Sequence, residues 1–312
     1  MKRFFVAGLI LLLTLALALE LRGYQSGEGA EPDPSPSPSL SVEPAPVLAF
    51  FGASNQPWCE ELREQTADWC RETGWELVEY DCLGLETTQD VQVDDLLRAG
   101  KAELAVLCAL GAQESLDAKA TALAEGGVAV ITLSGSPLEP PEDALCHLGP
   151  DSDSFWGAAA RFFRSEDGAP RLILLRDSSG SELENAARDG LEGVEATVLE
   201  EVFTWGSADY AQQFLTEALD RQNRVDGVVC FSRTGAQGAR AALGGTGRRG
   251  EIPVLCMTAS QTLWDDLERG VLDGLATLDA RAGAEALEQA LTQACQGKVP
   301  VGGTLPVAVQ TK

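Results

Sequence analysis

The stretch from residue 47 to residue 81, VLAFFGASNQPWCEELREQTADWCRETGWELVEYD, decides the fold. It predicts an apolar strand over 47–51, a polar loop, a helix over 57–73 and a second strand over 75–80. Pro57 suits the first turn of that helix, and Gly74 suits the position after its last turn. A strand that feeds a helix and then a second strand forms a parallel crossover unit. Its loop lies at the carboxyl end of the sheet, where such folds bind ligands.

The same alternation continues to the end of the chain. Further strands are expected over 103–109, 128–133, 145–148, 171–175, 195–203, 227–231, 252–257, 274–278 and 305–310, with helices between most of them. Short runs rich in Val, Ile and Leu indicate sheets covered on both faces. The pattern predicts an α/β protein, and the number of strands favours two sheets over one.

The loop Gln56-Pro57-Trp58-Cys59 resembles the Asn-Pro-aromatic-aromatic loop of type I periplasmic binding proteins, the ribose-binding group. Further matches in the same order are Val130–Leu133, Ala187–Gly190, Ala208–Tyr210 and Gly238–Leu243. The resemblance covers about 46–312 and implies two doubly wound parallel-sheet lobes joined by a hinge of three crossings. It places 46–148 and 278–297 in lobe one, and 149–277 and 298–312 in lobe two.

The first 45 residues are predicted to lie outside these lobes. Residues 1–24 hold a basic start and an apolar run typical of an export signal, and cleaved signal and uncleaved anchor are both compatible with it. No cysteine for lipid attachment follows the run. Residues 25–45, rich in Pro, Ser, Gly and Glu, are interpreted as an extended spacer. We therefore expect an extracytoplasmic domain, secreted or held at the membrane.

Composition and motifs exclude several functions. The formal net charge of -25 argues against a nucleic-acid partner, because phosphates demand a basic surface. The single histidine, His147, has no Gly-x-Ser-x-Gly elbow with it and is interpreted as a structural residue near the hinge. The Gly-x-Gly-x-x-Gly run over 245–250 precedes a strand instead of following one, so it is expected to be a loop. We expect no enzyme activity, no cofactor and no metal site.

Eight cysteines in an exported chain could form disulfides, because exported proteins reach an oxidising environment. Cys108, Cys230 and Cys256 lie inside apolar runs and are expected to be buried thiols. A bridge between Cys59 and Cys82 is compatible with the helix running back along its strand.

The resemblance also implies a ligand cleft between the lobes. Trp58 and Tyr210 match family aromatic positions, and Arg188 matches the family arginine. Each has an alternative: core packing for Trp58, helix packing for Tyr210 and a solvated charge for Arg188. The full set of candidate ligand-binding residues is Asn55, Gln56, Trp58, Ser134, Arg188, Tyr210, Ser232, Arg233, Thr258 and Thr277.

Several of these positions depart from the family pattern. Its paired acids and amides are replaced by Ser134-Gly135, Ser232-Arg233, Thr258 and Thr277. Charged hydrogen bonds are roughly twice as strong as neutral ones, so the fold is better supported than the binding of an ordinary sugar. The two arginines, without matched acids, favour an anionic or phosphorylated ligand.

Two functions follow. The first is an extracytoplasmic solute-binding protein, expected to be a monomer, that closes on a small polar, sugar-like ligand and presents it to an ABC permease or a membrane sensor. The alternative is a membrane-tethered interaction or sensory module that kept the fold and lost small-molecule binding.

Overall fold

The computed structural model describes residues 44–164, 168–177 and 181–312. Residues 45–312 form one compact unit. The expected leader and nearly all of the expected spacer lie outside the described residues. Within the described ranges, no helix combines the length and the apolar character needed to cross a bilayer.

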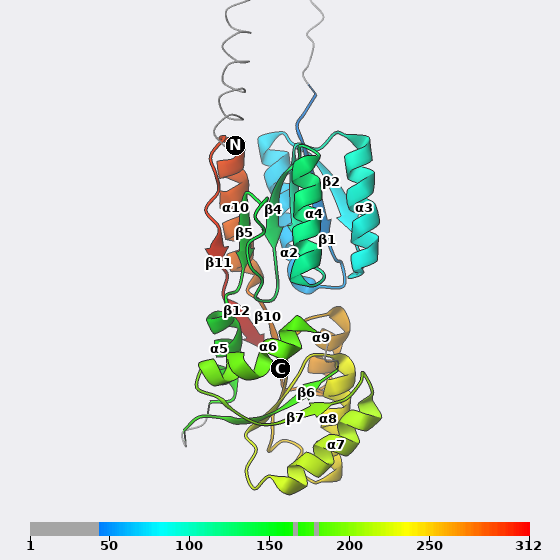
Figure 1. Cartoon of the computed structure of the whole chain (residues 1–312), viewed down its shortest axis with the longest axis vertical. Helices are drawn as coiled ribbons and strands as arrows, with labels where there is room; N and C mark the ends of the chain where they lie inside the picture. The colour runs from blue at the N-terminus through cyan, green and yellow to red at the C-terminus, as the bar shows by residue number, and fades with distance from the viewer. Residues whose placement is uncertain (1–43, 165–167, 178–180) are drawn as a thin grey trace, which may run out of the picture. The chain divides into compact units, whose positions relative to one another are not determined.

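The first lobe is built on a six-stranded parallel sheet with helices on both faces (Figure 1). The strand order is β11-β5-β4-β3-β1-β2. Its strands are β1 (Val47–Gly52), β2 (Glu76–Asp81), β3 (Leu104–Cys108), β4 (Ala129–Leu133), β5 (Cys146–Gly149) and β11 (Gly303–Thr304). Its helices are α2 (Pro57–Thr73), α3 (Glu86–Ala99), α4 (Gln113–Glu125) and α10 (Ala280–Cys295).

The second lobe repeats this plan with the order β12-β10-β9-β8-β6-β7. Its strands are β6 (Arg171–Arg176), β7 (Thr197–Phe203), β8 (Gly227–Cys230), β9 (Val254–Cys256), β10 (Gly274–Leu278) and β12 (Val307–Gln310). Its helices are α5 (Ser152–Phe162), α6 (Glu182–Gly193), α7 (Ala208–Arg221), α8 (Arg233–Gly245) and α9 (Gln261–Glu268). Only β12 runs antiparallel to its neighbour, β10, among the strands described here. The expected α/β fold with two doubly wound sheets is confirmed.

The opening unit folds as its sequence predicts. Pro57 is the first residue of α2, where its missing N–H leaves no internal hydrogen bond unmade. Gly74 ends the helix with φ 78°, a left-handed conformation that favours glycine. The 245–250 run lies where α8 ends and the chain turns towards β9, which confirms that it is a loop.

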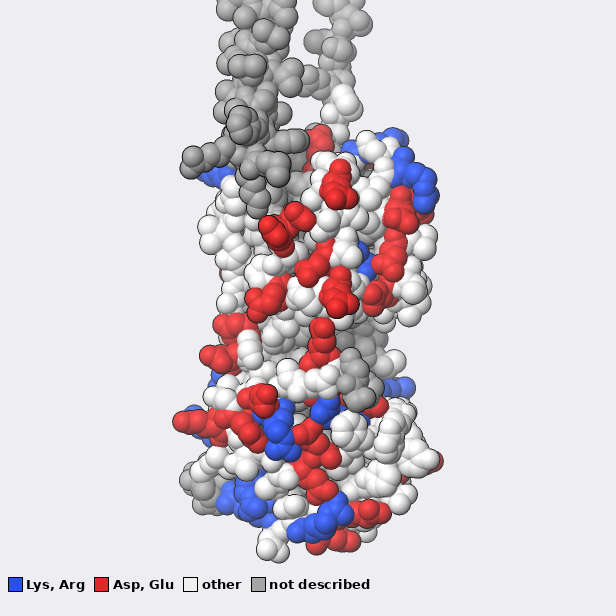
Figure 2. All heavy atoms as spheres, viewed as in Figure 1, with Lys and Arg blue, Asp and Glu red and all other residues white. Residues whose placement is uncertain are grey.

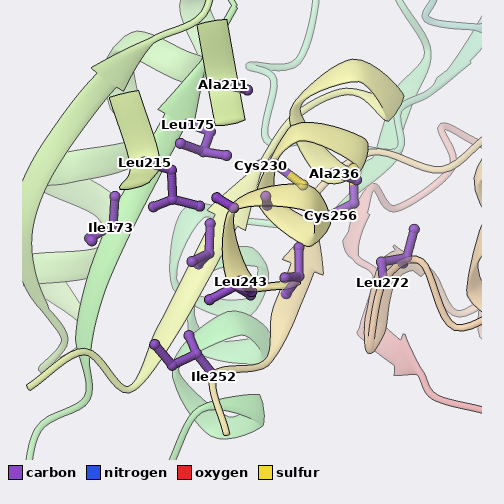
Figure 3. Packing of buried hydrophobic residues seen from close by; sticks show 14 of the residues in the cluster. Ile173, Leu175, Ala211, Leu215, Cys230, Ala236, Leu243, Ile252, Cys256 and Leu272 are labelled. Atoms are coloured by element: carbon purple, nitrogen blue, oxygen red, sulfur yellow. The ribbon is translucent and has the colours of Figure 1, made fainter. Parts of the chain in front are cut away.

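Each sheet separates two buried hydrophobic clusters. In lobe one, Leu48 and Phe50 face the cluster of α2 and α10, while Ala49 and Phe51 face the opposite cluster, with α3 and α4. In lobe two, Figure 3 shows one of the two clusters, with Cys230 and Cys256 side by side beneath α8. Alternate strand residues supply opposite clusters because successive side chains point to opposite faces.

The last crossing between the lobes differs from expectation. Gly303 pairs with Leu148 and Thr304 with Gly149, so β11 belongs to the first sheet. The chain therefore crosses at residues 305–306, and assigning all of 298–312 to lobe two was wrong. Both β11 residues are exposed, so no apolar pattern marked the strand.

The three crossing segments are hydrogen-bonded to one another. The N–H of Leu305 donates to the Gly149 oxygen at 2.8 Å, and the N–H of Asp279 donates to the Pro306 oxygen at 2.9 Å. The Asp279 side chain also accepts from the N–H of Ala282 and caps α10. The hinge is thus an ordered set of backbone segments at one edge of both sheets.

All eight cysteines are described, and all are free thiols in this structure. Cys108, Cys230 and Cys256 are fully buried, as expected. The bridge between Cys59 and Cys82 is not formed, because the two residues pack in clusters on opposite faces of the first sheet. Cys59 lies beside Cys108 instead, and the Cys82 thiol donates to the Gln92 side-chain oxygen at 2.9 Å.

Candidate functional site

A cavity of about 200 Å³ lies between the carboxyl ends of the two sheets. From lobe one it is lined by residues that follow β1, β3 and β4: Gln56, Trp58, Ala109, Leu110, Gly111, Gly135 and Ser136. From lobe two it is lined by residues of α6, β10 and the loop after β9: Leu183, Met257, Thr258, Ala259, Ala276, Thr277 and Leu278. Parallel strands place the loops that follow them at one edge, which is where α/β folds bind ligands.

Trp58 forms part of both the cavity wall and the core. It is 5% exposed and packs with the cluster of α2 and α10. A Cβ atom at Gly135 would lie 3.2 Å from the Trp58 Cε2 and Nε1 atoms, so the indole lies directly on the Gly135 backbone. The absence of a side chain at 135 therefore allows the ring to take this place.

The polar side chains on the wall are neutral, and some of them already make hydrogen bonds to other protein groups. The Thr258 hydroxyl donates to the Phe231 oxygen at 2.7 Å. The Thr277 hydroxyl donates to the Leu278 oxygen at 3.4 Å, and the Gln56 side-chain oxygen accepts from the Cys59 thiol at 3.7 Å. Within the described parts of the chain, the Gln56 amide nitrogen and the Ser136 hydroxyl have no hydrogen-bond partner, so both groups are available to a ligand.

Ser134 and His147 lie in a buried chain of hydrogen bonds behind this wall. The Ser134 hydroxyl donates to the Ser136 oxygen at 2.7 Å and contacts His147 Nε2 at 3.1 Å. His147 Nδ1 lies 2.9 Å from the Thr132 hydroxyl. Burial lowers the pKa of His147 to about 4, so the ring is neutral at ordinary pH. The structural interpretation of His147 agrees with this placement, and Ser134 is turned towards the histidine.

Two hydrogen bonds connect the lobes directly. The Asn55 oxygen accepts from the N–H of Gln261, the first residue of α9, at 2.9 Å. The N–H of Gln113, the first residue of α4, donates to the Glu182 carboxylate at 3.3 Å. The Asn55 side chain donates to the Leu83 oxygen at 3.1 Å. Asn55 thus joins the lobes through its backbone, while its side chain stays in lobe one.

Arg188 does not line the cavity. Its guanidinium pairs with Glu201 and Glu192 and donates to the Val198 oxygen at 3.1 Å, on the β7 side of α6. These acids raise the pKa of Arg188 further above its ordinary value, with the Glu201 hydrogen bond as the largest cause. The inference that this arginine lacked a matched acid was therefore wrong.

Ser232 and Arg233 begin α8 and also lie outside the cavity wall. The Ser232 hydroxyl accepts from the N–H of Gly235 at 3.0 Å and caps the helix. Arg233 makes a two-pronged pair with Asp266, whose side chain is 2% exposed. That partner removes the basis for an anionic ligand at this arginine as well.

Tyr210 belongs to an exposed aromatic group on lobe two. Its ring stacks on Phe214 at 5.8 Å between ring centres and meets Trp205 edge-on at 5.9 Å. Tyr210 is 49% exposed and Trp205 66% exposed. Tyr210 lies outside the cavity wall, and these ring contacts come from its own helix, α7, and from the loop before it, not from the next helix as the packing alternative expected.

The structure thus brings four of the ten candidate residues, Gln56, Trp58, Thr258 and Thr277, to one cavity. Sequence reasoning missed Leu110, Ser136, Leu183 and Met257 on its wall. Leu110, Ser136 and Met257 each stand just beyond a buried strand, a position that could have indicated them. No local signal distinguishes Leu183, which lies in the first turn of α6.

No metal centre is apparent at the site. No group of three or more His, Cys, Asp or Glu side chains within 44–164, 168–177 and 181–312 is arranged to hold a metal ion. Acidic side chains are spread over both lobes on the face in Figure 2, with basic ones among them on lobe two. This face has no continuous basic surface of the kind that binds nucleic acid.

Residues 47–299 match the sequence profile of a family described as the periplasmic binding protein domain. No curated protein sequence matches the chain significantly.

Solved structures share the fold at low identity. One is an ABC transporter solute binding protein from Bacillus halodurans C-125 with bound myo-inositol, at TM-score 0.61 and 16% identity, covering 85% of this chain and 94% of that one. Another is the Caulobacter myo-inositol binding protein, at TM-score 0.60 and 19% identity, covering 85% and 93%. A third is the fructose binding periplasmic domain of a hybrid two component system, at TM-score 0.63 and 15% identity, covering 86% and 91%.

Proposed function

Since the chain belongs to the periplasmic binding protein domain family, a family of binding proteins and not of enzymes, we propose that it is an extracytoplasmic solute-binding protein for a small, sugar-like or sugar-derived molecule. The observation that carries this proposal is the cavity between the lobes, to which each lobe contributes about half of the wall. A ligand there touches both lobes at once, so its binding energy favours their closure.

The structural neighbours support a sugar-like ligand. They are compatible with delivery of that ligand either to a transporter or to a sensor. Two of them carry myo-inositol, and the third is the fructose binding periplasmic domain of a hybrid two component system. A closed complex of this chain would present its ligand to an ABC permease or to a membrane sensor. The apolar run over 1–24 would direct the domain out of the cytoplasm, where it is either secreted after cleavage or held at the membrane through the spacer over 25–45. We expect the domain to be a monomer.

A thermal-shift screen of sugars, cyclitols, sugar derivatives and nucleosides tests the proposal. A ligand present at about 100 times its Kd stabilises the folded state by about 2.7 kcal/mol, which raises Tm. The variant Ser136→Phe fills the cavity and should abolish the shift. Ser136→Ala leaves the cavity open and should retain most of the shift, because it removes at most one hydrogen bond of about 1 kcal/mol to the ligand. A shift that survives Ser136→Phe would place the ligand elsewhere.

The contacts between the lobes favour a second candidate, an interaction or sensory module that no longer binds a small molecule. Asn55 to Gln261 and Gln113 to Glu182 are hydrogen bonds between protein groups, so the lobes hold together without a solute. This candidate predicts no thermal shift with any compound in the screen. It also predicts a specific membrane partner that is retained with equal affinity by the Ser136→Phe variant.

A further inference from the structure

We infer that two equivalent turns, one on each lobe, form a docking surface for a single protein partner that has apolar pockets in a basic surface. The turns are Cys82–Leu85, called the Leu83 turn, and Thr204–Ser207, called the Trp205 turn. Neither turn lines the cavity between the lobes. The inference therefore goes beyond the proposed function and holds for either of its two candidates.

The two turns occupy the same place in the duplicated plan of the lobes. The Leu83 turn connects β2 to α3, and the Trp205 turn connects β7 to α7. Each of these strands is the edge strand farthest from β11 or β12 in its sheet. The N–H of Leu85 donates to the Cys82 oxygen at 2.8 Å, and the N–H of Ser207 donates to the Thr204 oxygen at 2.9 Å. Both lobes thus carry the same closed turn at the carboxyl end of the edge strand.

Both turns place a bulky side chain where the backbone favours glycine. φ is 51° at Leu83 and 48° at Trp205, and the following residues, Gly84 and Gly206, have φ of 71° and 69°. Two successive positive φ values are typical of a type I′ turn, whose central positions are dominated by Asn, Asp and Gly. A leucine or tryptophan there is strained, because its Cβ atom crowds the following carbonyl oxygen. An asparagine would make the same turn with less strain.

The strained side chains are also exposed. Leu83 is 57% exposed and Trp205 66% exposed, so most of each side chain gains no burial to offset the strain. Leu85 and Val91, at 55% and 59%, extend the apolar surface of lobe one, and Tyr210 extends that of lobe two. Strain combined with exposure at the same position of both lobes indicates a role outside the fold. Exposed apolar patches of this kind mark interaction sites.

The surface around both turns is acidic. Its exposed acids are Asp81, Glu86, Asp90 and Asp94 on lobe one, and Asp209 and Glu217 on lobe two. Acidic side chains lie along the α3 side of lobe one in Figure 2. The only basic residues of α3 and α7 are Arg98 and Arg221, in their last turns. Lys119 pairs with Asp90 at 2.8 Å, but its side chain is only 6% exposed and lies beneath that acid.

This charge selects among the possible occupants of the surface. A protein partner needs basic groups around the pockets that receive Leu83 and Trp205, because complementary charges favour association and like charges oppose it. An anionic lipid surface is repelled by the same acids. A second copy of this chain is disfavoured too, since each copy has a formal net charge of -25.

Site-specific photocrosslinking in the cells that produce the full chain tests this surface. A photoreactive phenylalanine analogue replaces Leu83 in one variant, Trp205 in a second and Val299 in a third. Val299 is the matched control, because it is 77% exposed and precedes β11 at the opposite edge of the first sheet. We expect mass spectrometry to identify the same protein from positions 83 and 205 and not from position 299.

Several crosslinking results would overturn the inference. These are different proteins from the two turns, equal crosslinking from position 299, a crosslinked dimer of this chain, and no crosslinked protein at all. Vesicles of phosphatidylcholine with phosphatidylglycerol that bind the parent protein but not Trp205→Asn would replace the protein partner by a membrane surface. Each of these results leaves the proposed function standing, because the thermal-shift screen tests the cavity separately.

Calorimetry with the purified crosslinked protein then measures the contribution of each turn. Leu83→Asn and Trp205→Asn should each raise its Kd at least about tenfold, as the loss of a central interface anchor does. Val299→Asn should leave the Kd unchanged. Raising NaCl from about 20 to about 500 mM should raise the Kd at least about threefold, because salt screens attraction between acidic and basic groups. A Kd that falls with salt, or that neither turn variant changes, would contradict the docking surface.

The same asparagine variants distinguish docking from a role in the fold. Asparagine suits the left-handed position of each turn, so neither Leu83→Asn nor Trp205→Asn should lower Tm by more than about 2 °C. A larger fall in Tm would show that the side chain stabilises the fold. That result would remove the reason for assigning the turn to a partner.

Discussion

The backbone oxygen of Asn55 in lobe one accepts a hydrogen bond from the backbone N–H of Gln261 in lobe two at 2.9 Å. Gln261 is the first residue of α9, and that N–H has no acceptor within its own helix. The bond therefore satisfies an otherwise free donor and links the lobes at the same time. Together with the hydrogen bond from Gln113 to Glu182, it connects the two lobes.

Removing this donor should open the lobes. Gln261→Pro deletes the N–H at a helix position where proline is well tolerated, and Ser260 before it already has the extended φ of -151° and ψ of 161° that proline requires. Loss of a hydrogen bond of about 1 kcal/mol shifts the balance towards the open form about fivefold. Small-angle scattering should report a larger radius of gyration for the variant.

Gln261→Ala is the matched control for lobe opening. It removes the same side chain and keeps the N–H, so it should scatter like the parent protein. Equal scattering from Gln261→Pro and Gln261→Ala would show that this bond does not hold the lobes.

Two glycines on α8 should respond oppositely to alanine. A Cβ atom at Gly238 would lie 2.3 Å from Ala211 Cβ and 2.5 Å from the Ala208 backbone oxygen, so α7 would have to move. Gly238→Ala should lower the free energy of unfolding by about 2 kcal/mol or more. Gly244 has no atom within 4 Å of such a Cβ, so Gly244→Ala should raise stability by about 0.5–1 kcal/mol.

Urea unfolding of both alanine variants compares these values on one helix, where the gain in helix propensity is common to both. Equal effects at the two positions would mean that the close contact of α7 with α8 does not limit the side chain at 238.

His147 should make the fold sensitive to acid. Its pKa is about 4 in the folded protein against an ordinary value of 6.5, because burial disfavours the charged ring. The unfolded chain takes up the proton first as the pH falls. The stability from the neutral ring is thus present above pH 6.5, falls as the pH drops towards 4 and changes no further below that value.

The size of the acid effect follows from the pKa difference and reaches about 3 kcal/mol in full, of which most is lost by pH 4.5. Urea unfolding of the parent and of His147→Gln at pH 7.5 and pH 4.5 measures it, because titration of the carboxylates is common to both proteins. The parent should lose more stability than the variant. A parallel loss in both proteins would contradict a buried neutral histidine.

Arg188 should matter for stability and not for ligand affinity. Arg188→Ala removes ion pairs to Glu201 and Glu192 and a hydrogen bond to the Val198 oxygen. Glu201 keeps Arg176 as a partner, so we expect a loss of about 1 kcal/mol in unfolding free energy. Calorimetry should give the same Kd of the best ligand for the Arg188→Ala variant as for the parent protein. A Kd raised about tenfold or more in this variant would return Arg188 to the site.

Local patterns were enough to predict the elements of the fold. The strand over 47–52, the proline that begins α2 and the glycine that ends it are properties of adjacent residues, so they are visible in the sequence. Alternation of strand and helix then predicted an α/β protein with two sheets, and the resemblance to type I periplasmic binding proteins implied that both sheets are doubly wound. The β11 strand was not predicted, because its two exposed residues carry no periodic pattern. Only their pairing with Leu148 and Gly149 defines the strand.

The sequence by itself determined the α/β fold, the burial of Cys108, Cys230 and Cys256, and the position of Gln56 and Trp58 at the carboxyl end of the first sheet. Only the tertiary structure decided that Arg188 and Arg233 are neutralised by Glu201 and Asp266, and that Leu183 from α6 completes an uncharged wall. The physical reason is distance along the chain. Periodicity is a local property, whereas the partner of a charge and the opposite wall of a cavity come from residues that only folding brings together.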